Sequence, residues 1–259
     1  MKMRGKTIFI TGGGSGIGRG LAEAFHKRGN RVIIAGRREG PLREVCAANA
    51  GMSWFALDVT HGDRLRSVAA QVTTQFPELN CVIANAGIQR VHDFAADKAV
   101  DEDSIEQEIA TNLLGMIRVC AAFLPHLRKQ PAATLINVSS ALAFVPIAMI
   151  PVYCATKAAV HSFTVSLRHQ LKDSKVEVIE LVPPYVATDL NRALAGRIPA
   201  TSGDTPMPLN EFIAKMMEEL ATASEEAAVG FAKSTLAASW TVASRAIFAK
   251  LNSAHTSRD

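Results

Sequence analysis

Residues 11–18 read Thr11-Gly12-Gly13-Gly14-Ser15-Gly16-Ile17-Gly18 and join a β-branched run to an amphipathic stretch. Glycine lets such a turn adopt positive φ and lets the backbone approach a ligand closely. A helix that begins here offers free N–H groups and a positive partial charge to an anion. We therefore predict a phosphate-binding turn, although a glycine-rich turn can also be only a tight connection. The candidate contacts are Gly12, Gly14, Ser15, Gly16, Ile17 and Gly18.

Short apolar runs alternate with longer helical patterns along most of the chain. The expected strands span residues 7–11, 31–35, 53–57, 81–84, 134–138, 176–182 and, less clearly, 227–229. The expected helices span residues 17–29, 42–50, 63–76, 103–129, 152–172, 208–223 and 234–251. Continuously apolar strands that alternate with helices are typical of a parallel sheet covered on both faces. With right-handed crossovers, this predicts an α/β, doubly wound fold with a mostly parallel sheet of six or seven strands.

Length and composition describe an ordinary globular chain of 259 residues, 48% of them hydrophobic, with a formal net charge of +4. This size suits one domain over 1–259, in which 189–225 form a flap and helix beside the substrate and 253–259 a flexible tail. No apolar run reaches the roughly 18 residues of a membrane span. The basic start is followed by only three apolar residues before the glycines, which is too few for a signal peptide. We expect a cytoplasmic protein without integral membrane association.

The cysteines and histidines are scattered rather than clustered. Cys46, Cys81, Cys120 and Cys154 lie far apart, and no CxxC or HExxH pattern occurs. Metal and disulfide frameworks need such spacings, so we expect reduced thiols and no metal site.

Positive charge gathers at the amino end, where residues 1–45 hold ten lysines and arginines against three acids. No basic run with interleaved aromatics follows, so a small phosphate-bearing ligand is favoured over nucleic acid. The second expected strand ends Ala35-Gly36-Arg37-Arg38, where dinucleotide folds usually place an acid that holds the ribose 2′-hydroxyl. Arginine binds a 2′-phosphate through charge-assisted hydrogen bonds. Arg37 and Arg38 therefore predict a preference for NADP(H) over NAD(H). The alternative is that they are only solvent-exposed residues at the start of a helix.

Tyr153 and Lys157 lie four residues apart on the expected helix 152–172, and therefore on one face. A nearby ammonium stabilises phenolate and so lowers the pKa of the phenol toward neutrality, where it can act as an acid or a base. Ser140 follows the fifth strand and can hydrogen-bond a substrate carbonyl oxygen, although serine there can also be a turn residue. Asn112 is a polar residue in an apolar helix, where a satisfied buried amide is the plainer interpretation.

Residues 5–190 resemble the short-chain dehydrogenase/reductase family, which has a compact Rossmann fold. The resemblance rests on the 11–18 turn, Asp58, Asn85-Ala86-Gly87, Asn112, Ser140 and Tyr153-Cys154-Ala155-Thr156-Lys157. It implies that Tyr153 exchanges the proton of the carbonyl or alcohol oxygen, that Lys157 binds the nicotinamide ribose, and that Ser140 orients the substrate. It also implies a water held by Asn112. The implied cofactor contacts are Asp58 and Val59 at the adenine, Asn85, Ala86 and Gly87 near the ribose, and Pro183, Val186 and Thr188 near the nicotinamide.

Two departures from the family pattern stand out. Pro183-Pro184-Tyr185 replaces the usual Pro-Gly after the sixth strand, and Ala84 replaces a frequent asparagine. Neither touches the proton-transfer groups, but the first alters the nicotinamide loop. The segments 182–184 and 207–212 are similar to a bacterial oxidoreductase branch named after the teichoic-acid D-alanylation locus. That similarity says little about the substrate.

These observations predict an NADP(H)-dependent oxidoreductase that interconverts a carbonyl and a secondary alcohol. Residues 141–152 form an apolar wall, from which we expect a hydrophobic small-molecule substrate. A non-catalytic NADP sensor with the same fold is the alternative, and a sugar-nucleotide epimerase or dehydratase ranks third. The family resemblance implies a homodimer or homotetramer, and small residues such as Ala155, Ala158, Ala159 and Ser162 would let its helices approach closely.

Overall fold

A seven-stranded parallel sheet forms the centre of the computed structural model, which describes residues 1–97, 99–194 and 205–252. The strand order is β3-β2-β1-β4-β5-β6-β7, and every neighbouring pair is parallel. The strands are β1 (Thr7–Thr11), β2 (Arg31–Gly36), β3 (Ser53–Ala56), β4 (Cys81–Ala84), β5 (Ala133–Val138), β6 (Val176–Val182) and β7 (Glu226–Ala228). The predicted doubly wound α/β fold is confirmed. Because the order reverses between β1 and β4, a crevice opens at the carboxyl ends of these strands.

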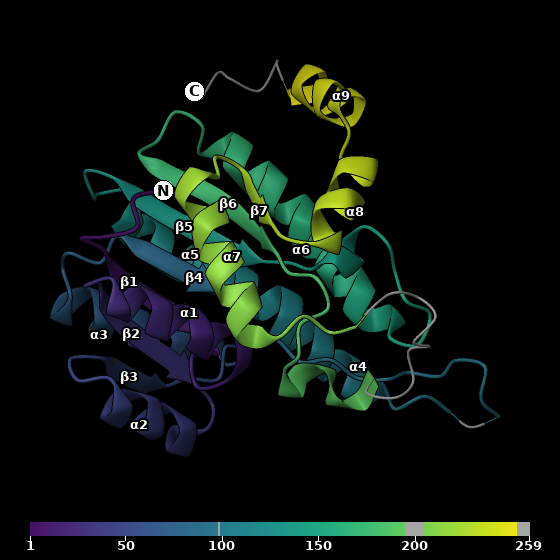
Figure 1. The fold of residues 1–259 in the computed structure, drawn as a ribbon, viewed down its shortest axis with the longest axis horizontal. Coiled ribbons are helices and arrows are strands. Elements are labelled where there is room, and N and C mark those ends of the chain that lie inside the picture. The colour runs from purple at the N-terminus through teal and green to yellow at the C-terminus, as the bar shows by residue number, and fades with distance from the viewer. Residues whose placement is uncertain (98, 195–204, 253–259) are drawn as a thin grey trace.

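Helices cover both faces of the sheet (Figure 1). One face carries α1 (Gly16–Lys27), α2 (Glu39–Ala48) and α7 (Leu209–Thr222), whose buried side chains pack in one cluster with β1 and β2. The other face carries α3 (Gly62–Gln75), α5 (Gly115–Leu127) and α6 (Pro151–Gln170). The remaining helices are α4 (Glu102–Ile109), α8 (Phe231–Ser239) and α9 (Val242–Asn252), with short turns η1 (Ala110–Leu114), η2 (Ala141–Ala143) and η3 (Asp189–Leu194).

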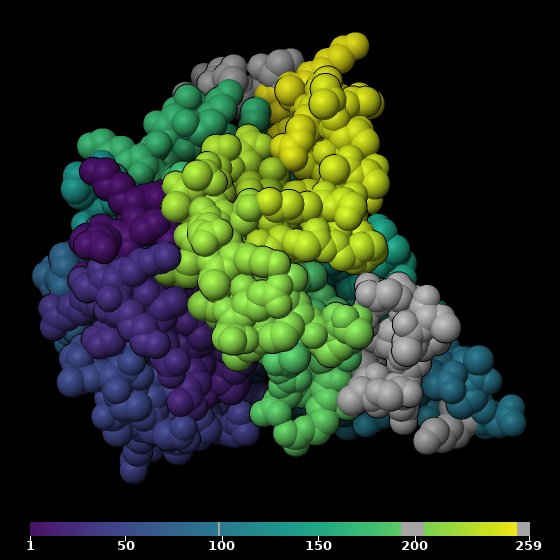
Figure 2. Space-filling model, in the orientation of Figure 1, coloured from purple at the N-terminus to yellow at the C-terminus, as the bar shows by residue number. Residues whose placement is uncertain are grey.

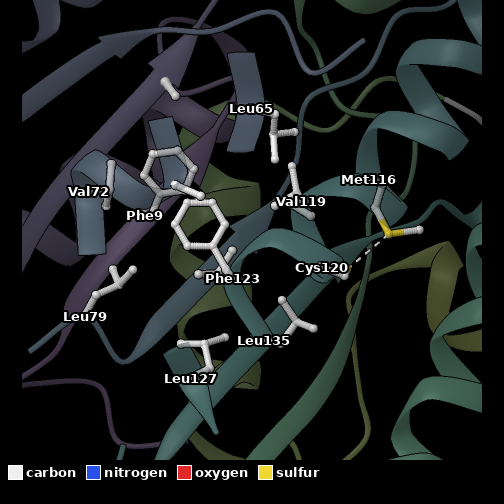
Figure 3. Close-up of a cluster of buried hydrophobic side chains, with 14 of the residues drawn as sticks. Phe9, Leu65, Val72, Leu79, Met116, Val119, Cys120, Phe123, Leu127 and Leu135 are labelled. Atoms are coloured by element: carbon white, nitrogen blue, oxygen red, sulfur yellow. Dashed lines mark hydrogen bonds between the residues drawn. The ribbon is translucent and has the colours of Figure 1, made fainter. Parts of the chain in front are cut away.

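The α3–α5 side of the sheet has a tightly packed aromatic centre (Figure 3). The rings of Phe9 on β1 and Phe123 on α5 lie 4.7 Å apart between centroids, and both are fully buried. Burying large aromatic side chains is among the strongest contributions to stability. Phe9 packs on the face that α3 and α5 cover, whereas its neighbours Ile8 and Ile10 pack on the opposite face, which α1 and α7 cover.

The expected helix over 103–129 is interrupted. It consists of α4, the π-helical turn η1 and α5, and it ends at Leu127. A Cβ at Gly115, where α5 begins, would come within 2.6 Å of Val59 Cγ2, so glycine permits the close approach there. Apolar periodicity does not distinguish a π turn from an α turn, so the sequence does not show this interruption.

The expected helix over 234–251 is also broken, into α8 and α9. α8 begins at Phe231, after Gly230 with a φ of 56°. Thr241 Oγ1 accepts a hydrogen bond from Ser244 N at 3.2 Å, which caps a new helix. The break follows from this local cap rather than from the apolar pattern.

The predicted flap over 189–225 comprises η3 and α7 in the described residues, joined to the sheet region by a bridge between Val186 and Met207. Residues 195–204 and the predicted tail 253–259 lie outside the described part. Figure 2 shows α7 on the surface, between the purple and blue amino-terminal part of the chain and the yellow α8–α9 segment.

One helical run among the described residues, Glu102–Leu127, is long and apolar enough to cross a membrane by length and composition. Its second half buries Met116, Val119 and Phe123 in the cluster that covers the sheet, as the core helix of a folded domain does. This run therefore gives no independent sign of a membrane span.

Gly18→Ala tests the close packing of α1 on the glycine turn. The new Cβ would lie 2.3 Å from Gly12 O and 2.5 Å from Asn85 Nδ2, so backbone must move. We expect a loss of roughly 1–3 kcal/mol in the free energy of unfolding, measured by chemical denaturation. Gly40→Ala on α2 is the matched control, because its Cβ meets nothing within 4 Å. Equal stability of the two variants would contradict this packing role.

Candidate active site

A cavity of about 340 Å³ lies where the carboxyl ends of β1, β2, β4, β5 and β6 meet. A smaller cavity of about 150 Å³ adjoins it and shares Gly12, Arg37 and Arg38 with it. The predicted residues that line the larger cavity are Gly12, Ser15, Gly16, Ile17, Arg37, Arg38, Asn85, Ala86, Gly87, Ser140, Tyr153, Lys157, Pro183, Val186 and Thr188. Gly14, Asp58 and Val59 line the smaller one. Of the predicted set, only Gly18 and Asn112 line neither of these two cavities.

The glycine turn is tied to the loop that follows β4. Thr11 Oγ1 accepts hydrogen bonds from the backbone N–H groups of Asn85 (3.0 Å) and Ala86 (3.1 Å). The side-chain amide of Asn85 donates to Thr11 O at 2.9 Å. The amide nitrogen of Asn85 is thus engaged in holding two strand ends together, and the two loops line the cavity side by side.

The amino end of α1 is open to an anion. Ser15 is the N-cap residue but makes no side-chain hydrogen bond there, and the first turn holds no acid. Gly12 and Gly16 have φ of 70° and 53°, values that favour glycine. The free N–H groups and the helix dipole therefore face the cavity without a competing carboxylate. Gly18 serves the packing of this turn rather than its lining.

Positive charge dominates the end of the cavity beside β2. Arg37 and Arg38 are both exposed and line both cavities. Asp58 lies close by. Burial acts to raise the pKa of Asp58, but hydrogen bonds from Thr60 and the charge of Arg37 outweigh it and hold the pKa below its usual value. The carboxylate is thus committed to Thr60 and Arg37, and the second arginine adds further positive charge.

Tyr153 and Lys157 project from neighbouring turns of α6 into the cavity, as the spacing predicts. Their side chains are 6% and 4% exposed, and Lys157 Nζ lies 5.6 Å from the centroid of the Tyr153 ring. Lys157 Nζ donates to Val138 O at the end of β5, at 2.8 Å. Ser140 hydrogen-bonds the Tyr153 side chain and also accepts from Leu142 N at 3.1 Å, so it is both a cavity residue and a turn cap.

The protonation of this pair differs from the sequence expectation. Burial raises the pKa of the Tyr153 phenol above its ordinary value, and the hydrogen bond with Ser140 offsets only part of that rise. Burial likewise lowers the pKa of Lys157 to about 8, against the charge of Glu180, which acts to raise it. The expected lowering of the phenol pKa by Lys157 was wrong for this structure. Desolvation is the largest influence on both groups, and the phenol therefore carries its proton at neutral pH.

Asn112 lies in the π turn η1 and is fully engaged in hydrogen bonds. Its Oδ1 accepts from Ile88 N at 2.8 Å, and its Nδ2 donates to Ile88 O at 2.8 Å and to Thr156 Oγ1 at 3.2 Å. These bonds fasten the loop after β4 to η1 and α6. The side chain matches the satisfied buried amide of the plainer interpretation.

Two buried acid–histidine pairs near the site were missed from the sequence. His92 Nε2 and Glu108 Oε2 lie 3.1 Å apart with almost no exposure, and the charge of Glu108 acts on Tyr153. His161 Nδ1 and Glu180 Oε2 lie 2.8 Å apart. Glu180 did carry a signal, because a charged residue interrupts the apolar run of β6. Its partner lies 19 positions away on α6, beyond the reach of local patterns.

No group of three or more potential metal ligands occurs among residues 1–97, 99–194 and 205–252. Cys81, Cys120 and Cys154 are buried free thiols, and Cys46 is a half-buried one. All four pack within the hydrophobic clusters of the described residues.

Comparison with known proteins agrees with the fold. The chain is 44% identical over 193 residues to the uncharacterized oxidoreductase DltE of Bacillus subtilis, covering 74% of this chain and 76% of that protein. It is 31% identical over 195 residues to an L-fucose dehydrogenase of Bos taurus, covering 75% and 71%.

Solved structures show the same architecture. A short chain dehydrogenase from Burkholderia cenocepacia in complex with NADP superposes with a TM-score of 0.79 at 25% identity, covering 97% of this chain and 99% of that one. A short chain dehydrogenase/reductase from Burkholderia phymatum in complex with NAD has a TM-score of 0.77 at 21% identity and covers 92% of each chain.

The family model described as short chain dehydrogenase matches residues 6–197, which include the glycine turn and the Tyr153–Lys157 pair. With this match, the similarity to DltE and the shared fold, the chain belongs to the short-chain dehydrogenase/reductase family.

Proposed function

We propose that the protein is an NADP(H)-dependent oxidoreductase that interconverts a carbonyl and a secondary alcohol. The observation that carries this proposal is one continuous cavity. Ser140, Tyr153 and Lys157 line one part of it, and the glycine turn with Arg37 and Arg38 lines another. A proton donor and an anion-binding helix end in one cavity fit a nicotinamide dinucleotide beside a small substrate.

The described residues fit this cofactor in their donor chemistry. The open amino end of α1 suits a pyrophosphate, and Arg37 and Arg38 suit the 2′-phosphate that distinguishes NADP from NAD. Asp58 and Val59 line the smaller cavity and suit the adenine end, whereas Pro183, Val186 and Thr188 line the larger one and suit the nicotinamide end. When bound, NADPH supplies the hydride.

The chain's own residues would handle the oxygen. Tyr153 is protonated at neutral pH, and burial, which raises its pKa, keeps it so; it would donate that proton to a carbonyl oxygen in the reductive direction. Ser140, bonded to the same phenol, would hold that oxygen in place. Lys157 would bind ribose hydroxyls with the donors that Val138 O leaves free.

The substrate side of the cavity favours an apolar molecule. Ile88, Leu142, Ile147, Leu190 and Phe231 line it, and the Phe231 side chain is 51% exposed. An exposed phenylalanine at a cavity rim is suited to contact with an apolar ligand. Because one relative is named for L-fucose, aldoses belong in the substrate panel beside aliphatic and aromatic ketones.

We also propose a homodimer or homotetramer built through the α4–α5 run and α6. Ala155, Ala158 and Ser162 are exposed on α6, and Ile109 and Leu114 are each 41% exposed on the α4–α5 run. Small residues flanked by exposed apolar ones let two helices pack closely.

Tyr153→Phe is expected to bind NADPH normally and to lose turnover. The substitution removes only the hydroxyl that carries the proton, and general acid catalysis contributes about 10²–10⁴-fold. Tryptophan-to-NADPH energy transfer measures binding, and NADPH oxidation across the substrate panel measures kcat. Full turnover in this variant would exclude the role of Tyr153. Binding by the wild-type protein with no turnover on any class would instead favour the sensor alternative.

Replacing both Arg37 and Arg38 by Gln is expected to raise the KM for NADPH roughly tenfold or more, with the KM for NADH unchanged. Hydrogen bonds to charged groups are worth about 1.5–3 kcal/mol, and NADH lacks the phosphate that would receive them. Arg43→Gln is the matched control, because Arg43 lies on α2 and bonds Glu39 at 2.7 Å outside both cavities. A wild-type preference for NADH would contradict the assignment.

Cofactor affinity is expected to fall as pH rises through the Lys157 pKa of about 8. Below this pH the ammonium is charged and donates to ribose hydroxyls, and above it the amine is neutral and a weaker donor. Isothermal titration of NADPH between about pH 6 and 9.5 measures the change. The Lys157→Met protein should show a flatter profile, and equal profiles for the two proteins would reject this role.

A further inference from the structure

Glu180 is a fully buried carboxylate in a strand whose other inward positions are apolar. It lies on β6, on the face that α6 covers, as do Val176 and Val178 of the same strand. Moving a carboxylate out of water costs several kcal/mol unless charged or polar partners repay it. Its partners therefore indicate what the carboxylate does.

Only one of its two oxygens has a hydrogen-bond partner. Oε2 lies 2.8 Å from His161 Nδ1, whereas Oε1 is buried and has no hydrogen-bond partner among the described residues. The backbone N–H of Glu180 is engaged separately with Glu225 O. His161 is held by ring contacts with Phe144 and Trp240, at 4.7 Å and 5.2 Å between centroids. His161 thus holds Glu180 Oε2 in place, and the charge of the carboxylate is left to act on neighbouring groups.

Lys157 is the cation on which that charge acts. It lies one turn before His161 on α6, and its ammonium donates to Val138 O. In the sheet register, Val138 pairs with Leu181 and Asn137 with Glu180, so Lys157 is anchored on the strand next to Glu180 and one position along. The charge of Glu180 opposes the effect of burial on the Lys157 pKa.

Other titratable groups near these residues have partners of their own. Glu226, in register with Glu180 on β7, bonds Arg168 at 3.2 Å and Arg245 at 3.0 Å. On the α4 side, Glu108 is paired with His92. The remaining groups are the Tyr153 phenol, the Cys154 thiol beside it on α6, and the Cys120 thiol on α5, which donates to Asn137. Glu180 is therefore the acid whose charge is left for Lys157.

We propose that Glu180, held in place by His161, is a positioning residue that keeps the buried Lys157 ammonium charged. It touches neither cavity, and it acts through the lysine. Its consequence for turnover rests on the proposed function, but its effect on the charge of Lys157 does not. The Tyr153–Lys157 pair at the cavity is thus backed by the His161–Glu180 pair, which lies between α6 and β6.

The test is a direct titration of Lys157 in the full-length protein, free and with NADP⁺. The ¹³Cε signal of labelled lysine, assigned with Lys157→Met, reports its charge at each pH. Glu180→Gln removes the charge and keeps the shape. Glu180→Leu is the second variant, because apolar side chains often replace buried charges without loss of stability. Glu177→Gln is the matched control, because Glu177 lies on the same strand but bonds Thr134 on the opposite face of the sheet.

Both Glu180 variants are expected to move the Lys157 midpoint down by about one pH unit or more, as loss of a nearby opposite charge does. Glu177→Gln should leave it in place. The predicted alkaline fall in NADPH affinity should shift by the same amount in the Glu180 variants. A wild-type midpoint retained in either variant would overturn the proposal, as would failure of both to fold, which would assign Glu180 to folding. Absence of turnover by the wild-type protein would overturn the proposed function instead, and the ¹³C titration would still decide this inference.

Discussion

The hydrogen bond from Lys157 Nζ to Val138 O joins α6 to the sheet at the edge of the cavity. An ammonium buried this deeply is unfavourable unless it has partners, and the carbonyl at the end of β5 is one such partner. The bond fixes α6 against β5, and this places Tyr153, one turn earlier, at the cavity. Because the same strand end leads directly to Ser140, one contact sets the relative positions of all three side chains.

Local chemistry made the sheet predictable. Each strand of residues 7–182 is a short apolar run, and the glycines of 11–18 and 29 mark where the chain turns. The predictions of uninterrupted helices over 103–129 and 234–251 were wrong for the same reason. Their apolar pattern runs on through the π turn at Ala110–Leu114 and through the break at Trp240, where backbone geometry and the Thr241 cap decide. Periodicity reports which residues face the core, and it does not report how the backbone closes its hydrogen bonds.

The site was predictable as a set of positions but not as a set of charges. The glycine turn, Ser140, Tyr153 and Lys157 have fixed spacings, so the sequence shows that they meet. A pKa depends on desolvation and on partners that are distant in the sequence, and neighbouring residues reveal neither of them. Hence the predicted direction of the Tyr153 pKa shift was wrong, and the sequence did not reveal the His161–Glu180 pair, although Glu180 interrupts an apolar strand.

Stability alone gives a poor account of Glu180. A buried acid–histidine pair with an unpartnered oxygen contributes less than apolar packing of similar volume, so an interior strand such as β6 has no folding need for it. The same reasoning applies to Lys157, whose burial lowers its own pKa. Two unfavourable charges on the same side of the sheet each reduce the cost of the other. Glu180 and Lys157 are thus understood as one unit. The unfavourable burial of an acid on β6 makes the burial of a cation on α6, beside the cavity, less unfavourable.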